Sequence, residues 1–159
     1  MSKFKIIAAA PLLLALAACS TNVTEKPGTG IAGGAGGAIA VQAVQGKVTA
    51  QNAPGDLLPR LTQAIQTEAG HNAGGSPANV EFTVVDYREV SNAVRALGGM
   101  LAGSDRLHIA VTVKDPSGKV LREFDVDRKS NPGGLGAVTD HEAGLINAAA
   151  KSIAQTLAK

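Results

Sequence analysis

The sequence has little aromatic surface: its 159 residues include one Tyr, three Phe and no Trp. Proteins that hold single-stranded nucleic acid stack its bases on aromatic side chains and neutralise its phosphates with clustered Lys and Arg. The 15 basic residues of this chain form no such cluster, and 13 acidic residues nearly balance them. We therefore expect no nucleic-acid partner.

Cysteine is almost absent, because Cys19 is the only one in the chain. No disulfide can therefore form within the chain, and zinc sites built from several thiolates are excluded. The three histidines, His71, His108 and His141, are far apart in the sequence and lack zinc-ligand spacing. These observations predict a protein without a bound metal or cofactor.

The start of the chain also lacks an apolar run of the roughly 20 residues that a transmembrane helix needs. Its uncharged apolar run, residues 6–16, follows Lys3 and Lys5 and precedes two alanines. A positive start, a short apolar centre and small residues before a cleavage point are the three parts of an export signal. Removal of residues 1–18 would leave 13 basic and 13 acidic residues, so the mature chain would be formally neutral.

Cys19 ends the segment Leu-Ala-Ala-Cys, which resembles the lipobox of bacterial lipoproteins. In that family the peptide is cut before the cysteine, whose thiol carries diacylglycerol and whose new amine is usually acylated as well. The alternative is an incidental thiol beside an ordinary cleavage point, but the agreement in position between signal and cysteine favours lipidation of Cys19. The same resemblance implies that Ser20, in place of Asp, permits transfer to the outer membrane.

Residues 19–37 are predicted to be the acylated cysteine and a flexible tether, because residues 22–37 are rich in Gly and small polar side chains. Gly30 and Gly34 have the spacing that packs membrane helices, yet the apolar stretch around them is too short to span a bilayer. An early strand is the remaining alternative for this segment. Residues 38–159 are then expected to form one domain that faces the periplasm.

Hydrophobic periodicity divides the first half of this domain into segments. In chain order they predict a strand (38–50), a helix (57–69), a loop (72–79), a strand (80–87) and a short helix or ordered loop (90–101). Asp56 is expected to cap the first helix with its side chain. Two adjacent glycines are the reason that the last segment remains undecided between helix and loop.

A β-hairpin is the clearest prediction. Residues 107–113 alternate apolar and polar side chains, and residues 119–128 return as a second strand. Between them, Asp-Pro-Ser-Gly at 115–118 places Asp, Pro and Gly where a type I turn favours them. The residues of the second strand expected to point inward are Val120, Phe124 and Val126.

The chain closes with a predicted helix. Thr139 and Glu142 have capping-box spacing ahead of an apolar helical stripe that runs to Leu157. The predicted order is therefore β-α-β-(α)-β-β-α. This order indicates an α+β fold, a small two-layer sandwich in which the C-terminal helix packs on an antiparallel or mixed sheet.

Glu123, Asp125 and Asp127 lie on one face of the second hairpin strand, because alternate strand residues share a face. They do not fit a calcium loop, since the central Gly and the closing Glu are missing. We expect a solvated acidic face, with Lys114 or Lys119 of the hairpin as partners.

No group of residues predicts catalysis. Asp140, His141 and Glu142 are adjacent on a helix and point in different directions, so they cannot form a proton relay with one another. The segments "GGMLAG" and "NPGGLG" lack the Gly-Lys-Ser/Thr of a phosphate loop and are more typical of turns. The surroundings of a serine or cysteine nucleophile are also missing, so we expect that the chain is not an enzyme and has no catalytic residue.

Three segments from Ser91 onward resemble a known family: "ALGGMLAGSDRLHIAVTVKDPSGKVLREFDV", "KSNPGGLG" and "AAAKSIAQTLA". They are similar to the small bacterial lipoproteins of the type called domain of unknown function 4410. Because the matching residues are structural, this resemblance implies a family and no activity. More loosely, the element order resembles small envelope domains such as the N-terminal domain of the Tol translocation protein and the activators of peptidoglycan synthases, whose linkers are longer than the tether expected here.

Together these features predict a lipid-anchored lipoprotein whose domain binds another envelope protein at the outer membrane without catalysis. The contact would be a sheet edge, the polar hairpin face or the loop with Gly133 and Gly134. The alternative is a domain that binds or senses a small ligand, a lipid or cell-wall fragment, between sheet and helices. A hydrolase would need a cleft that brings Ser104 or Ser117 beside His108.

Overall fold

The computed structural model describes residues 20–27, 38–70, 75–98, 103–130 and 141–159. Within these residues the elements are β1 (Ser20–Glu25), β2 (Ile39–Val48), α1 (Leu57–Ala69), β3 (Ser76–Arg88), α2 (Asn92–Gly98), β4 (Asp105–Lys114), β5 (Val120–Ser130) and α3 (His141–Leu157). The strands form one sheet in the order β1-β5-β4-β3-β2. The sheet is mixed, because β2 and β3 are parallel while the other neighbouring pairs are antiparallel. The predicted α+β class is confirmed.

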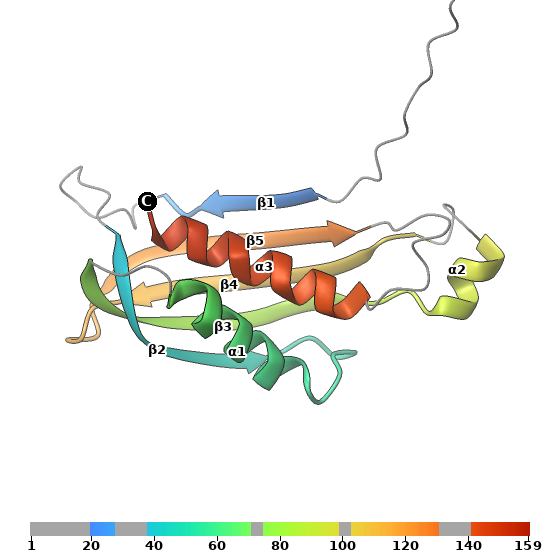
Figure 1. Ribbon diagram of the computed structural model, residues 1–159, viewed down its shortest axis with the longest axis horizontal. Coiled ribbons are helices and arrows are strands. Elements are labelled where there is room, and N and C mark those ends of the chain that lie inside the picture. The colour runs from blue at the N-terminus through green and yellow to red at the C-terminus, as the bar shows by residue number, and fades with distance from the viewer. Residues whose placement is uncertain (1–19, 28–37, 71–74, 99–102, 131–140) are drawn as a thin grey trace, which may run out of the picture.

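α1 and α3 form the second layer of the sandwich and lie on one face of the sheet (Figure 1). α1 connects β2 to β3, and a helical crossover of this kind allows two neighbouring strands to run parallel. α3 contacts α1 and also β5, β4 and β1. No helix of the described residues lies across the other side of the sheet, which we call the open face (Figure 1).

The core lies between the two layers and is built from alternate strand residues. The buried apolar residues of the three central strands are Ala78, Val80, Phe82, Val84, Tyr87, Leu107, Ile109, Val111, Val113, Phe124 and Val126. Since side chains alternate across a strand, the residues between them face the open side. The alternation predicted for 80–84 and 107–113 is therefore confirmed, and it fixes which side of the sheet the helices cover.

α1 follows the predicted apolar spacing. Leu57, Leu61 and Ile65 are fully buried on one helix face. The predicted side-chain cap is wrong, because Asp56 stands at the N-cap position without a capping hydrogen bond. Its backbone is already helical (φ −93°, ψ −2°), and its carboxylate lies 3.5 Å from the guanidinium of Arg60 one turn later.

The predicted hairpin of β4 and β5 is confirmed. The Gly118 N–H donates to the Asp115 carbonyl at 2.9 Å and closes the turn, with Gly118 at φ +88°, where a side chain would be strained. Asp115 Oδ1 also accepts the Ser117 N–H at 2.8 Å. The prediction that Val120 points inward is wrong: this residue is exposed, because the register shifts beside its partner Lys114.

The segment left undecided between helix and loop contains α2, a single short helix that extends beyond the end of the sheet (Figure 1). α3 buries the predicted stripe from Leu145 to Leu157 against the sheet. Its predicted cap, Thr139, lies outside the described residues. None of the described helices is long and apolar enough to cross a bilayer.

β1 corrects the predicted tether. This strand pairs antiparallel with β5 and forms one edge of the sheet. The Arg128 guanidinium donates to Thr21 Oγ1 at 2.8 Å, and the Arg122 guanidinium binds the Glu25 carboxylate. Backbone pairing and two arginines hold this strand, so residues 20–25 adopt the early strand that was the alternative to a tether. The Gly-rich residues 28–37 lie outside the described residues.

β3 begins at Ser76, earlier than predicted. Gly75 enters the strand at φ +147°, and a Cβ there would lie 1.8 Å from the Ala38 carbonyl oxygen. This turn delivers Pro77 to the start of the strand, one of the positions in a sheet that proline tolerates. Residues 76–79, expected as a loop, therefore pair with β2.

Candidate functional site

The open face carries the polar side chains that alternate with the core residues of the sheet. Its charged and polar residues on the inner strands and β2 include Gln45, Lys47, Glu81, Thr83, Asp86, Arg106, His108, Thr112, Lys114, Glu123, Asp125 and Asp127. Residues opposite one another on neighbouring strands have side chains about 5 Å apart, so unlike charges meet across the strands. The face is therefore a surface of ordered charge pairs.

Two ion pairs show this order. Lys114 Nζ on β4 lies 2.6 Å from Glu81 Oε2 on β3, and Lys26 Nζ lies 3.4 Å from Asp125 Oδ1 on β5. The prediction that Lys114 pairs with the acidic row of β5 is wrong, because the register shift at Lys114 moves β5 out of line and leaves Glu81 in reach.

Asp127 joins two side chains of β4. Arg106 Nη2 donates to Asp127 Oδ2 at 2.9 Å, and His108 Nδ1 lies 3.7 Å from the same oxygen. Burial opposes ionisation of Asp127, but the hydrogen bond and charge of Arg106, with Lys129 and His108 nearby, hold the pKa of this carboxyl below its usual value. Asp127 is therefore a carboxylate at neutral pH and accepts hydrogen bonds.

A shallow hollow of about 300 Å³ lies on the open face across β2, β3 and β4. Its polar lining residues are Gln45, Lys47, Glu81, Thr83 and Thr112. These amide, hydroxyl and charged groups can donate and accept hydrogen bonds. The hollow is suited to a polar chain, such as a peptide segment, more than to an apolar ligand.

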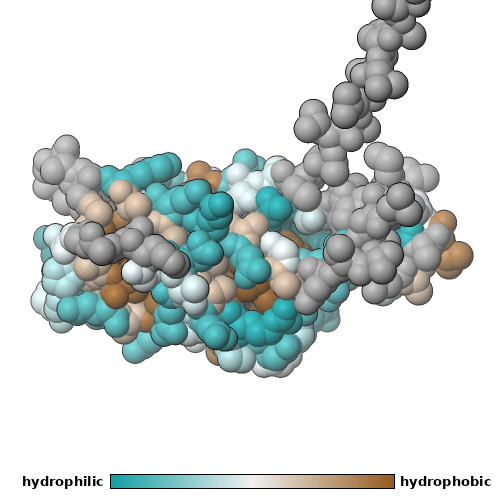
Figure 2. Space-filling view, in the orientation of Figure 1, coloured by the Kyte–Doolittle hydropathy of each residue, from teal (hydrophilic) through white to brown (hydrophobic). Residues whose placement is uncertain are grey.

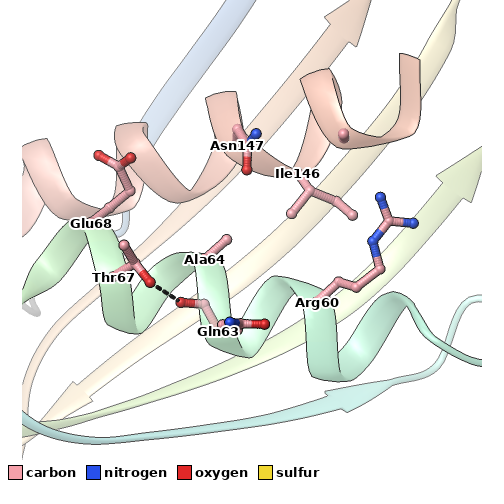
Figure 3. A pocket seen from close by; sticks show the side chains of 8 residues that line it. Arg60, Gln63, Ala64, Thr67, Glu68, Ile146 and Asn147 are labelled. Carbon is pink, nitrogen blue, oxygen red and sulfur yellow. Dashed lines mark hydrogen bonds between the residues drawn. The ribbon is translucent and has the colours of Figure 1, made fainter. Parts of the chain in front are cut away.

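A second hollow of about 280 Å³ is the groove between α1 and α3. Figure 3 shows Arg60 and Gln63 of α1 and Ile146 and Asn147 of α3 around it. The Arg60 guanidinium is engaged there, because it lies 2.7 Å from the Glu142 carboxylate of α3. The groove has a mixed lining, in which Ala64, Ala143 and Ile146 are apolar. Its volume is just below that of typical small-molecule sites, which occupy about 300–1,000 Å³ and are mostly apolar.

The ligand hypothesis places its pocket between the sheet and the helices. A hollow of about 200 Å³ between β2 and α1, lined by Val41, Val44 and Gln66 among others, has that position. Its volume is below the usual range for small-molecule sites.

A buried ion pair was missed by the sequence analysis. Arg95 of α2 and Asp105 of β4 are in contact with both side chains almost fully buried. Asp105 Oδ1 also accepts the Val90 N–H at 2.8 Å, and Arg95 Nε donates to the Val90 carbonyl at 2.9 Å. Breaking such a pair costs about 3–5 kcal/mol, so it fixes α2 to the end of the sheet. No spacing rule pairs these two residues across an intervening loop.

Tyr87 is buried near the same end of the sheet. Its hydroxyl lies 3.1 Å from Glu89 Oε2, to which it donates. Burial first, and then the carboxylates of Glu89 and Glu142, raise the pKa of the phenol above its ordinary value. Tyr87 therefore keeps its proton at neutral pH and serves as a hydrogen-bond donor.

Ser104 and Ser117, considered as nucleophiles, lie out of hydrogen-bond reach of His108. His108 lies on β4, four residues after Ser104 and six before the end of the strand at Lys114. At about 3.3 Å per strand residue, these separations are roughly 13 and 20 Å, beyond hydrogen-bond reach. The Ser117 hydroxyl instead donates to Asp115 Oδ1 at 2.6 Å in the hairpin turn.

The remaining predicted site residues divide into two groups. Cys19, His71 and the loop with Gly133 and Gly134 lie outside the described residues, whereas His141 is the first residue of α3. In the part of the chain that the structure describes, no group of three or more His, Cys, Asp or Glu side chains is placed to hold a metal ion.

Comparisons with known proteins give one family and, among the similar solved structures, two of one protein. A family model described as "Domain of unknown function (DUF4410)" matches residues 37–134, earlier in its start than the resemblance seen from Ser91. No curated protein matches the chain. Two solved structures of the PelC dodecamer from Paraburkholderia phytofirmans are similar at 12% identity. One has a TM-score of 0.49 and covers 83% of this chain and 96% of its own. The other, of a single-residue variant, has a TM-score of 0.45 and covers 88% and 97%.

Proposed function

This chain belongs to the DUF4410 family, and we propose, from the Leu-Ala-Ala-Cys segment at its start and from its open face, that it is a lipid-anchored envelope protein whose domain binds another envelope protein without catalysing a reaction. In this proposal acylated Cys19 holds the domain on the outer membrane, facing the periplasm. The observation that carries the binding role is the open face, a sheet surface without a helix across it among the described residues and ordered by cross-strand charge pairs.

The position of β1 supports the anchor. Ser20, the first residue of β1, directly follows Cys19, so a cut before Cys19 leaves every described strand and helix whole. Two or three acyl chains, each stabilised by about 0.8 kcal/mol per buried CH₂, keep a protein on a bilayer. Lipid attached at Cys19 would therefore secure a domain whose described helices are all too short to span.

The charge pairs support a protein partner. Lys114 and Glu81, and likewise Arg106 and Asp127, are held by one another on rigid neighbouring strands. Side chains that are already ordered lose less conformational entropy when a partner binds. A fixed pattern of positive and negative groups also selects a partner with the complementary pattern. The open face is therefore suited to recognise one protein surface among many.

The test is a charge swap that preserves pairing. Glu81→Lys combined with Lys114→Glu reverses the local pattern on the open face but keeps an ion pair between β3 and β4. The matched control, Arg60→Glu with Glu142→Arg, makes the same exchange between α1 and α3 on the helix layer. Each tagged variant is crosslinked in cells and captured from detergent-solubilised membranes, beside wild type.

We expect the wild type and the helix-layer swap to recover the same envelope protein, and the open-face swap to lose it. Equal recovery by all three chains would reject the open face as the binding surface. Intact-mass measurement of the captured wild type, which should show diacylglycerol and an acyl chain on Cys19, tests the anchor independently.

Small-ligand binding is the second candidate, supported by the groove between α1 and α3. Its polar walls and central Ile146 would accept a cell-wall fragment or a lipid headgroup. Thermal stabilisation of the purified protein by such a compound, without capture of a protein partner, would favour this candidate over the first.

A further inference from the structure

We propose that α2 is a second membrane contact, seated in the headgroup region of the bilayer that holds the acyl chains of Cys19. This inference rests on the proposed lipid anchor and adds an orientation for the domain: the end of the sheet that carries α2 faces the lipid. In this proposal the exposed side of α2 contacts the surface of the bilayer.

α2 presents apolar side chains to solvent. Leu97 is 93% exposed and Val94 is 50% exposed. Residues three apart lie on the same face of a helix, so these two side chains form one apolar surface. Figure 2 shows hydrophobic atoms gathered at the end of the molecule where α2 lies. Adjacent exposed apolar side chains form a patch through which a helix can contact a lipid or protein surface.

The surface is firmly attached to the domain. A helix of seven residues is unstable alone, but the buried contact between Arg95 and Asp105 joins α2 to β4. The Arg95 N–H also donates to the Ser91 carbonyl at 3.0 Å, which continues the helix from its first turn. α2 therefore holds Val94 and Leu97 in a fixed place relative to the sheet.

The strand register places the anchor at the same end. Ser20 of β1 pairs with Lys129, Lys129 pairs with Arg106, and Arg106 pairs with Arg88. With strands about 4.8 Å apart, this row crosses roughly 14 Å from β1 to β3. Cys19 precedes the row by one residue, and α2 begins four residues after it. The start of β1 and the start of α2 therefore lie at the same end of the sheet (Figure 1).

A short connection would keep this end of the domain close to the bilayer. Consecutive Cα atoms are 3.8 Å apart, so lipid on Cys19 brings the end of β1 to within a few ångströms of the headgroups. α2 is the apolar element at this end, and it extends beyond the strands (Figure 1). Interfacial helices bury their apolar side chains about 5–10 Å into the headgroup boundary. Val94 and Leu97 are placed to do so.

Charge contributes little to this contact. Arg88, Arg106 and Lys129 are basic, but Asp86 and Glu89 lie near them and Arg106 is already shared with the open-face carboxylates. We therefore expect the contact to form on zwitterionic bilayers as well as on anionic ones.

The test uses the complete lipidated protein, purified from membranes and reconstituted into phosphatidylcholine vesicles. Because lipid on Cys19 blocks the only native thiol, each of Val94→Cys and Leu97→Cys offers one site for an environment-sensitive fluorophore. Val120→Cys is the matched control, since Val120 is a 40% exposed valine at the opposite end of the sheet. Quenching is measured with aqueous iodide and with lipids brominated on their acyl chains.

We expect the labels at 94 and 97 to be quenched by brominated lipid and to be several-fold less sensitive to iodide than the label at 120. If all three labels respond alike, α2 does not touch the bilayer. Shielding in native membranes that vanishes in pure vesicles would assign the surface to a protein and overturn the proposal. An intact mass without lipid on Cys19 would reject the proposed function itself, so the two failures are distinguishable.

Discussion

Tyr87 is the residue whose titration reports the fold most directly, because it is the only tyrosine and the chain has no tryptophan. Its burial and the nearby carboxylates of Glu89 and Glu142 raise its pKa above the ordinary value near 10. We expect the ultraviolet absorbance of tyrosinate to be absent as the pH passes 10, and then to rise together with alkaline unfolding. Gradual ionisation of the folded protein near pH 10 would contradict this expectation.

The sign of the pH dependence follows from the same shift. The folded state binds the phenolic proton more tightly than the unfolded state, so the contribution of Tyr87 to stability is complete below pH 10 and is lost as the pH rises through the folded pKa. Tyr87→Phe cannot ionise. Its free energy of unfolding, followed by circular dichroism, should therefore fall less steeply than that of wild type above pH 10.

For single residues, the sequence predicts which residue types share a face better than it predicts which side chains contact one another. The acidic row of β5 is visible as Glu123, Asp125 and Asp127 at alternate positions. Its partners are not, because Arg106 reaches Asp127 only through the register of two strands. The contact between Arg95 and Asp105 depends on how α2 and β4 are placed relative to one another, which no local sequence pattern predicts.

Among the elements, β2 contains a position that only glycine fits. A Cβ on Gly46 would lie 2.1 Å from Cζ of Phe82, whose ring is buried in the core beside it. We expect Gly46→Ala to lower the free energy of unfolding by about 1–3 kcal/mol, because an overpacked core must shift the ring. Urea denaturation of the purified protein measures this difference.

Gly144 of α3 is the matched control, since a Cβ there meets nothing within 4 Å. Gly144→Ala should raise the free energy of unfolding by up to about 1 kcal/mol, because alanine is the better helix former. Combining Gly46→Ala with Phe82→Leu should remove the clash and recover part of the loss. The same small effect from both single substitutions would show that the Phe82 ring is free to move.

Elements with one buried face were predictable, and the others were not. β4 and α3 repeat apolar residues at the periods of a strand and a helix, because one side of each faces the core. β1 has only Val23 as an apolar residue and is exposed along most of its length, so no period distinguishes it from a tether. Its order comes from β5, a partner about a hundred residues away in the sequence.

At the scale of the whole molecule, the direct connection between Cys19, the proposed anchor, and β1 can be tested. Inserting 15 Gly and Ser residues between Cys19 and Ser20, beginning with Ser, would give the domain a typical reach of about 20 Å from the membrane. We expect lipidation and the free energy of unfolding to remain unchanged. A fluorophore on Leu97→Cys should become as accessible to iodide as one on Val120→Cys.

The insertion distinguishes attachment through lipid on Cys19 from contact between α2 and the bilayer. If Leu97 remains shielded with the linker in place, α2 binds the bilayer with its own affinity and does not depend on the short connection. If the inserted chain loses lipid, the residues after the cysteine affect processing, and the measurement is repeated with a copy of the Ser-Thr pair placed between Cys19 and the insertion, so that β1 (Ser20–Glu25) stays whole. Intact mass of each purified chain distinguishes these results.

The antiparallel pairing of β1 with β5 also determines how the domain would bear force through the proposed anchor. With lipid on Cys19, tension between membrane and partner would enter the fold at Ser20, and the backbone hydrogen bonds between the two strands are perpendicular to the strand axis. Tension directed along that axis loads all of these backbone hydrogen bonds together, and the ion pair between Arg122 and Glu25 must break with them. Tension directed sideways peels them apart one at a time from Ser20. The attachment therefore resists a load along its strands and yields to one across them.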